Sequence, residues 1–167
     1  HAKRKGQTLA NELSSGSIAE AAGADAPSLD QSTMTAIEEL ASDIQQAHAI
    51  LIATSNLYPA ASRIDLALQA AFNAAWQANQ AARSGELGRV KSYLREAINN
   101  LELSDVLIRY GDVANPIDVP SYMVRQHYVD FLNREPDESG SDFWVNQIAS
   151  CGTDAHCVEI RRINVSA

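Results

Sequence analysis

The sequence is short of aromatic residues and of long apolar runs, and each shortage excludes a class of protein. Phe, Trp and Tyr make up only 6% of the 167 residues. Together with frequent alanine, this favours closely packed helices over a β-sandwich. No segment approaches the roughly 18 uninterrupted apolar residues that a membrane-spanning helix needs. We therefore expect an all-α protein without a transmembrane segment.

Positive charge is also scarce. The chain has 13 Lys and Arg against 21 Asp and Glu, which gives a net charge of −8. Nucleic-acid binding needs clustered basic residues, so we predict no nucleic-acid partner. The exception is the run Lys3, Arg4 and Lys5 near the N-terminus. This run indicates either a peripheral contact with an acidic partner or a membrane surface, or a solvated tail.

Motifs that anchor catalysis or a cofactor are missing as well. The sequence has no His-Glu-x-x-His, no Cys-x-x-Cys-His, no Gly-x-Ser-x-Gly and no Walker or Rossmann glycine pattern. A di-iron bundle needs a Glu three residues before each ligating His. Gln45 stands at that position before His48 and Val124 before His127, so neither histidine is part of a Glu-x-x-His pair. We therefore predict no catalytic residue, no metal and no cofactor.

The two cysteines, Cys151 and Cys157, are separated by a segment that contains Gly152. A zinc site needs a second pair of ligands, which the sequence lacks. A chain reversal at Gly152 would bring the second cysteine back beside the first. We predict a disulfide and hence an oxidising compartment; two buried thiols in a cytosolic protein are the alternative.

Composition and periodicity divide the chain into four parts. Residues 1–29 are rich in Ala, Ser and Gly and contain no aromatic residue, which predicts an extended or partly ordered N-terminal arm that lies on a partner. In 30–110, three apolar stripes with spacings of three and four predict an antiparallel three-helix bundle. Two prolines and a glycine in 111–120 predict a linker. We expect three shorter helices in 121–167.

Short polar residues mark where these helices start, because their side chains cap free backbone amides. The Tyr58-Pro59 step is expected to end the first bundle helix. The candidate caps are Asp30, Ser32 or Thr35 for that helix, Asp137 or Ser139 for the second helix of the C-terminal part, and Thr153 or Asp154 for the last helix.

The acidic loop after the first C-terminal helix has a possible metal-binding interpretation. If it were a calcium loop, Glu135 would stand first and Asn146 twelfth, where Asp and a bidentate Glu are required. We therefore favour structural roles, in which Arg134 pairs with a carboxylate and Asp137 or Ser139 caps the next helix.

The stretch YVDFLNREPDESGSDFW, which begins at Tyr128, contains an aromatic residue, an Asp-Phe-Leu-x-Arg-Glu-Pro-Asp run, a glycine and an aromatic-Trp pair. This pattern resembles the bacterial domain of unknown function 4214. Ser141 departs from it, because an apolar residue is more usual there. The resemblance covers 121–167, and we expect this copy to be truncated. The matching residues are Tyr128, Asp130, Phe131, Leu132, Arg134, Glu135, Pro136, Asp137, Gly140, Phe143 and Trp144.

The resemblance implies a helical interaction unit in a secreted or surface protein, without assigned catalytic residues. We therefore predict a non-enzymatic protein–protein interaction module that is secreted, periplasmic or at the bacterial cell surface and binds other protein subunits. One alternative is a scaffolding subunit of a filament or pigment–protein assembly, and another is an enzyme with an unrecognised site. The candidate partner-binding residues are Lys3, Arg4, Lys5, Tyr122 and Trp144.

Overall fold

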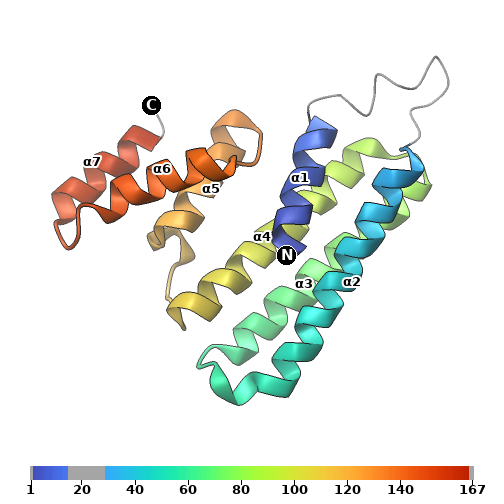
Figure 1. The fold of residues 1–167 in the computed structure, drawn as a ribbon, viewed down its shortest axis with the longest axis horizontal. Coiled ribbons are helices and arrows are strands. Elements are labelled where there is room, and N and C mark those ends of the chain that lie inside the picture. Colours follow the sequence, from blue (N-terminus) through green and yellow to red (C-terminus); the bar gives the residue numbers. More distant parts are fainter. Residues whose placement is uncertain (1, 15–28, 166–167) are drawn as a thin grey trace. The chain divides into compact units, whose positions relative to one another are not determined.

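The computed structural model describes residues 2–14 and 29–165 (Figure 1). Within these ranges the chain forms seven α-helices and two 3₁₀ helices and contains no β-strand, which confirms the all-α prediction. The elements in chain order are α1 (Ala2–Ser14), α2 (Gln31–Thr54), η1 (Ser55–Leu57), α3 (Ala61–Arg83), α4 (Leu87–Tyr110), η2 (Pro116–Asp118), α5 (Pro120–Leu132), α6 (Glu138–Ala149) and α7 (Ala155–Val165).

The chain divides into two compact units, 1–113 and 114–167. The division falls inside the segment 111–120, which was expected to be a linker. That segment is not wholly irregular: it includes η2, and Pro120 is the first residue of α5. Proline suits this position because its fixed φ is helical and its missing amide hydrogen is not needed there.

Alanine allows the long helices of the first unit to pack closely. Figure 1 shows α2, α3 and α4 running antiparallel, and an ion pair of 2.6 Å joins Arg83 at the end of α3 to Glu38 near the start of α2. The small side chains of α3 let the neighbouring backbones approach. The buried alanines of α3 are Ala67, Ala71, Ala74, Ala75, Ala78, Ala81 and Ala82.

The ends of α2 follow local chemistry. The Asp30 carboxylate accepts a hydrogen bond of 2.7 Å from the amide of Thr33, so Asp30 is the cap among the three candidates. The α-helix ends at Thr54 and continues as η1, whereas we expected it to run on to the Tyr58-Pro59 step. A tighter last turn of this kind is common at helix ends.

Residues 2–14 form helix α1, which differs from the extended or partly ordered arm that composition indicated; residues 15–28 of that arm lie outside the described part of the chain. Leu9 and Leu13 lie one turn apart and are buried in the core of the first unit. Gly6 precedes them on the same face. A Cβ atom at Gly6 would lie 2.9 Å from Cγ1 of Ile98, so glycine permits the close approach of α1 to α4.

This close approach generates a prediction. We expect Gly6→Leu to force α1 away from Ile98 at a cost of about 1–3 kcal/mol. Amide hydrogen exchange of residues 2–14 should therefore accelerate by roughly tenfold or more. Gly88→Leu is the matched control, because Gly88 is also helical but a Cβ there meets nothing within 4 Å. Equal protection of α1 in both variants would contradict this packing.

Candidate functional site

A buried ion pair organises the loop that joins α5 to α6. Nε and Nη2 of Arg125 donate to the two carboxylate oxygens of Glu135 at 2.8 and 2.6 Å. The side chains are only 2% and 3% exposed. Two parallel hydrogen bonds fix the planar groups relative to each other. This pair therefore holds the loop against α5.

From the sequence we expected Arg134 to pair with a carboxylate of this loop. In the structure, Nη1 of Arg134 lies 3.6 Å from Oδ1 of Asp137, and its guanidinium lies 4.9 Å from the ring centre of Tyr128. Arg125 went unnoticed, although a signal was present. It lies between the buried Val124 and Tyr128 of α5, and a charge on an apolar helix face needs a buried partner.

Asp137 is the cap of α6, the first of the two candidates. Its carboxylate accepts hydrogen bonds from Ser139 Oγ at 2.6 Å and from the Gly140 amide at 2.9 Å. These bonds lower the pKa of Asp137 to about 2. Gly140 also has a steric role, since a Cβ there would lie 2.7 Å from Oη of Tyr128. Several residues of the recognised motif thus stabilise the α5–α6 turn.

The aromatic candidates Tyr122 and Trp144 are only half exposed. Trp144 packs against the core of the second unit and makes an edge contact with Phe143, whose ring centre lies 5.1 Å away. Phe143 is the exposed member of this pair. The remaining motif residues are Pro136, which is buried, and Asp130, Phe131 and Leu132, which are exposed.

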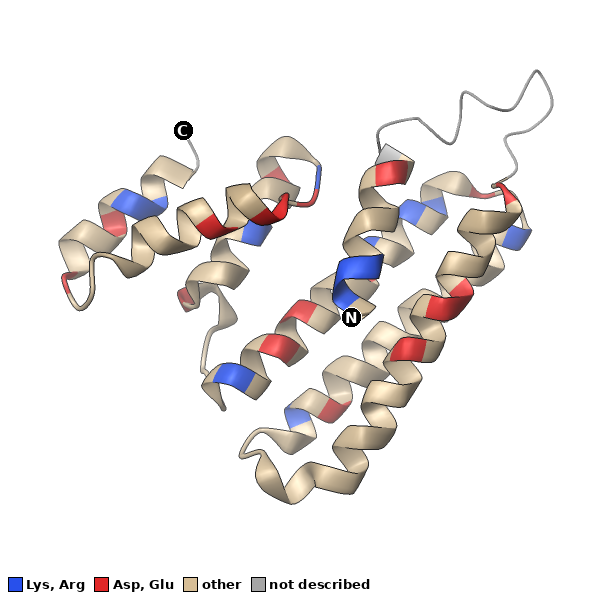
Figure 2. Ribbon diagram, viewed as in Figure 1, with Lys and Arg blue, Asp and Glu red and all other residues tan. Residues whose placement is uncertain are grey.

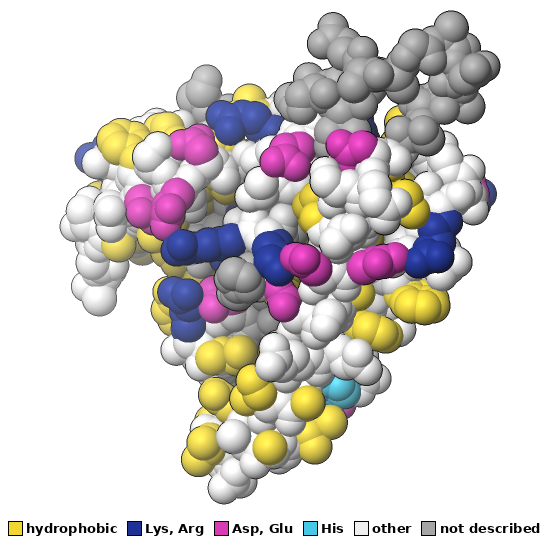
Figure 3. All heavy atoms as spheres, turned by 45° about the vertical axis from the view of Figure 1, so that its right-hand side comes forward, with side chains coloured by type: hydrophobic (Ala, Val, Ile, Leu, Met, Phe, Trp, Pro, Cys, Tyr) yellow, Lys and Arg dark blue, Asp and Glu magenta, His cyan; other side chains and the backbone are white. Residues whose placement is uncertain are grey.

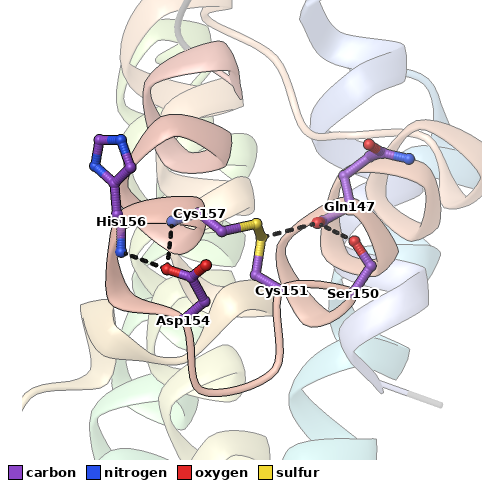
Figure 4. The surroundings of a disulfide bond; sticks show 6 residues. All are labelled: Gln147, Ser150, Cys151, Asp154, His156 and Cys157. Atoms are coloured by element: carbon purple, nitrogen blue, oxygen red, sulfur yellow. Dashed lines mark hydrogen bonds between the residues drawn. A yellow bond between two sulfur atoms is a disulfide. The ribbon is translucent and has the colours of Figure 1, made fainter.

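A disulfide joins Cys151 to Cys157 across a Cα–Cα distance of 5.5 Å, as the sequence predicted (Figure 4). The chain reverses at Gly152, whose φ of 56° lies in the left-handed region. Oδ1 of Asp154 accepts from the amides of His156 and Cys157 at 3.0 and 3.1 Å, so Asp154 caps α7. The disulfide therefore ties the end of α6 to the first turn of α7.

Helix α7 leaves an open groove beside α5. None of its side chains is fully buried, and the groove has a volume of about 560 Å³. The Arg162 guanidinium at its edge donates to the carbonyl of Ile117 at 3.1 Å. This groove is the candidate binding site. Its lining residues are Met123, His127, Gly152, Thr153, Ala155, Val158, Glu159, Arg162 and Ile163.

The basic candidates Lys3, Arg4 and Lys5 lie on α1. Lys3 contacts the carboxylates of Glu102 and Asp105 on α4, and the Glu102 side chain is only 1% exposed. Lys3 therefore neutralises a carboxylate that the fold buries. Arg4 is exposed between the two lysines.

Lys5 makes the corresponding contacts with α2. Its Nζ lies 3.0 Å from Oε2 of Glu39 and 3.2 Å from Oδ2 of Asp43, and these hydrogen bonds raise its pKa. Both lysines therefore contact acidic residues of their own unit, one on each side of α1. A role for this basic run in binding a partner remains a prediction.

The described ranges, 2–14 and 29–165, contain no group of three or more His, Cys, Asp or Glu side chains placed to hold a metal ion. In the acidic loop, Glu135 is paired with Arg125 and Asp137 caps α6. Among the helices within 2–14 and 29–165, none has both the length and the hydrophobicity of a membrane-spanning segment.

Comparisons of the chain with protein-family models, curated proteins and solved structures found no match. The resemblance to domain 4214 therefore remains a prediction that depends on the motif residues between Tyr128 and Trp144.

The buried ion pair generates a second prediction. Glu135→Leu removes the carboxylate that accepts two hydrogen bonds from the buried Arg125 guanidinium, so we expect it to lower the unfolding free energy of the second unit by about 3–5 kcal/mol. Adding Arg125→Met should recover most of that loss. Urea unfolding, followed by Trp144 fluorescence in a Trp76→Phe background, measures both effects.

The exposed Arg134 provides the control for this set of variants. We expect Arg134→Met to lower the unfolding free energy of the second unit by about 1 kcal/mol or less. A double variant that is less stable than both single variants would show that the Arg125–Glu135 pair is not coupled as described.

The Asp137 cap generates a pH prediction. Its folded pKa of about 2 lies below the ordinary value of 3.8, so its contribution to stability is present above pH 4 and is lost as the pH falls toward 2. We expect Asp137→Asn, which keeps a capping oxygen, to remove this part of the pH dependence. Urea unfolding of the second unit at several pH values between 5 and 2 measures it. An unchanged acid slope in the variant would contradict the assignment.

Proposed function

We propose that the chain is a non-enzymatic protein–protein interaction module of a secreted or cell-envelope protein, and that a partner binds the groove between α5 and α7. The observation that carries the proposal is the exposure of α7. This helix has only 11 residues, none fully buried, and it presents Ile160 and Ile163 to solvent. A helix of this length is not stable alone in water. The disulfide keeps it in place, and a partner would bury its apolar side chains.

The chemistry of the groove fits an amphipathic helix or a similar peptide segment. Met123, Val158 and Ile163 supply apolar contacts along the groove. His127 and Arg162 add polar groups that would fix the orientation of the bound segment. A short row of apolar positions bordered by polar groups is typical of helix-in-groove recognition.

The proposed compartment follows from the disulfide. The bond between Cys151 and Cys157 weakly favours an oxidising environment, because cytosolic thiols are kept reduced. The resemblance to domain 4214 points in the same direction. Both observations support a secreted, periplasmic or cell-surface protein.

A scaffolding subunit of a filament or pigment–protein assembly is the second candidate. It is favoured by further exposed apolar side chains in the second unit, namely those of Phe131, Leu132 and Phe143. These side chains do not line the groove. A subunit that contacts several neighbours would use these side chains as well as the groove. It would purify together with its neighbours in fixed stoichiometry.

The groove is tested by selecting helical peptides from a displayed library for binding to the full chain. We expect Ile163→Glu to weaken the selected peptides at least tenfold, because it places a charge in an apolar contact. Ile160→Glu is the matched control: Ile160 is exposed on the same helix but does not line the groove, so binding should persist.

Two results would contradict the proposal. One is that the library yields no binder, or that all binders tolerate Ile163→Glu. The other concerns the compartment: mass spectrometry without reductant that finds free thiols at both Cys151 and Cys157 in the native protein would remove its main support.

A further inference from the structure

The end of the first unit where α2 leads into α3 lacks charge. Between Asp43 and Arg63 the sequence has no Asp, Glu, Lys or Arg. Figure 2 shows the lower half of α2 and the turn that follows in tan, without red or blue. An uncharged stretch of this length is unusual on the surface of a chain with a net charge of −8.

Large aliphatic side chains are exposed at this end. Ile50, Ile52 and Leu57 are 58%, 63% and 67% exposed, and we call these three residues the bundle tip. Hydrophobic side chains gather at the lower end of the molecule in Figure 3, where the α2–α3 turn lies. Leu66, on the second turn of α3, extends this apolar surface with 65% exposure.

The tip residues point in different directions. Ile50 and Ile52 flank the buried Leu51 on α2, and at about 100° per residue their side chains project toward nearly opposite sides of the helix. Leu57 lies beyond the helix end, in η1. A groove on another protein would bury residues on one face of a helix, at spacings of three and four. Apolar side chains that project in different directions from one turn instead match an apolar medium that contacts the turn from several sides.

The charged residues closest to the tip are paired. His48 contacts Asp65, which also accepts a hydrogen bond of 2.9 Å from Gln69. Arg63 contacts Asp112, and its Nη1 donates to a backbone carbonyl at 2.8 Å. Burying an unpaired charge in a medium of low dielectric constant is costly, and pairing reduces that cost. The tip is thus bordered by charges that have partners.

The dimensions agree with a shallow insertion. Ile50 lies four residues before the end of α2, about 6 Å along the helix axis. Interfacial elements reach about 5–10 Å into the headgroup and acyl boundary of a bilayer. The half-exposed Tyr58 follows Leu57, and tyrosine is enriched at this boundary.

We propose that the bundle tip inserts into the interface of a lipid bilayer of zwitterionic lipids. The acidic chain is repelled by anionic headgroups, so the contact is driven by apolar burial rather than by charge. From the sequence, a peripheral membrane contact was expected at Lys3, Arg4 and Lys5. Because Lys3 and Lys5 contact carboxylates of their own unit, we place the proposed membrane contact at the α2–α3 turn instead. This proposal does not depend on the groove.

Flotation of the full chain with phosphatidylcholine vesicles tests the proposal. We expect the wild-type protein to float with the vesicles and Leu57→Ser or Ile52→Ser to lower the partition coefficient about tenfold each. Both side chains are exposed, so circular dichroism should show unchanged thermal unfolding. Trp76→Ser is the matched control: Trp76 is 54% exposed in the middle of α3, and its replacement should leave flotation unchanged.

The remaining outcomes are also decisive. Phosphatidylserine in the vesicles should weaken flotation at low salt; a gain instead would indicate binding by basic residues and overturn the proposal. Failure of the wild-type protein to float, or equal flotation of the tip variants, overturns it too. The last measurement is light scattering of the protein without lipid, which reports its oligomeric state. If the wild-type protein is a dimer and Leu57→Ser is a monomer, the tip is a contact between two copies of the chain, and the membrane proposal is overturned.

Discussion

The second unit depends on one covalent constraint, the disulfide that ties α7 to α6. An 11-residue helix without a fully buried side chain gains too little from packing to offset its conformational entropy. Closing the short loop between Cys151 and Cys157 contributes about 2 kcal/mol by restricting the unfolded chain. The constraint allows α7 to keep Ile163 exposed beside the groove. The open groove and the cross-link are thus two aspects of the same arrangement.

Charge has the complementary role in the first unit. The alanine-lined helices α2, α3 and α4 bury little volume per residue, so α1 adds Leu9 and Leu13 to their core. Its two lysines border this apolar contact and meet carboxylates on both neighbouring helices. Basic residues that are already engaged by the protein's own acidic groups contribute little to a positive surface field.

Periodicity and turn chemistry predicted the parts of the fold that depend on neighbours in sequence. These parts are the helices of the segment 30–110 and the disulfide between Cys151 and Cys157, which depends on the chain reversal at Gly152. Helix α1 was missed because the residues that follow it are rich in Ala, Ser and Gly, as disordered segments are. Within the helix, the only residues that indicate a helical apolar face are Gly6, Leu9 and Leu13. The Arg125–Glu135 pair was missed for another reason: its members are brought together by the α5–α6 turn, and sequence spacing alone does not show that contact.

The groove and the bundle tip expose apolar side chains in different ways, and this difference bears on what each contacts. Met123, Val158 and Ile163 line one open groove, so a single partner segment could contact all three. Ile50, Ile52 and Leu57 surround a convex end, where no single surface can cover all three. A bilayer interface imposes no single orientation, because it is fluid and contacts every side of an inserted turn. The two surfaces lie on different units, so occupation of one requires no residue of the other. Membrane contact by the first unit and partner binding by the second unit would therefore use separate sets of residues.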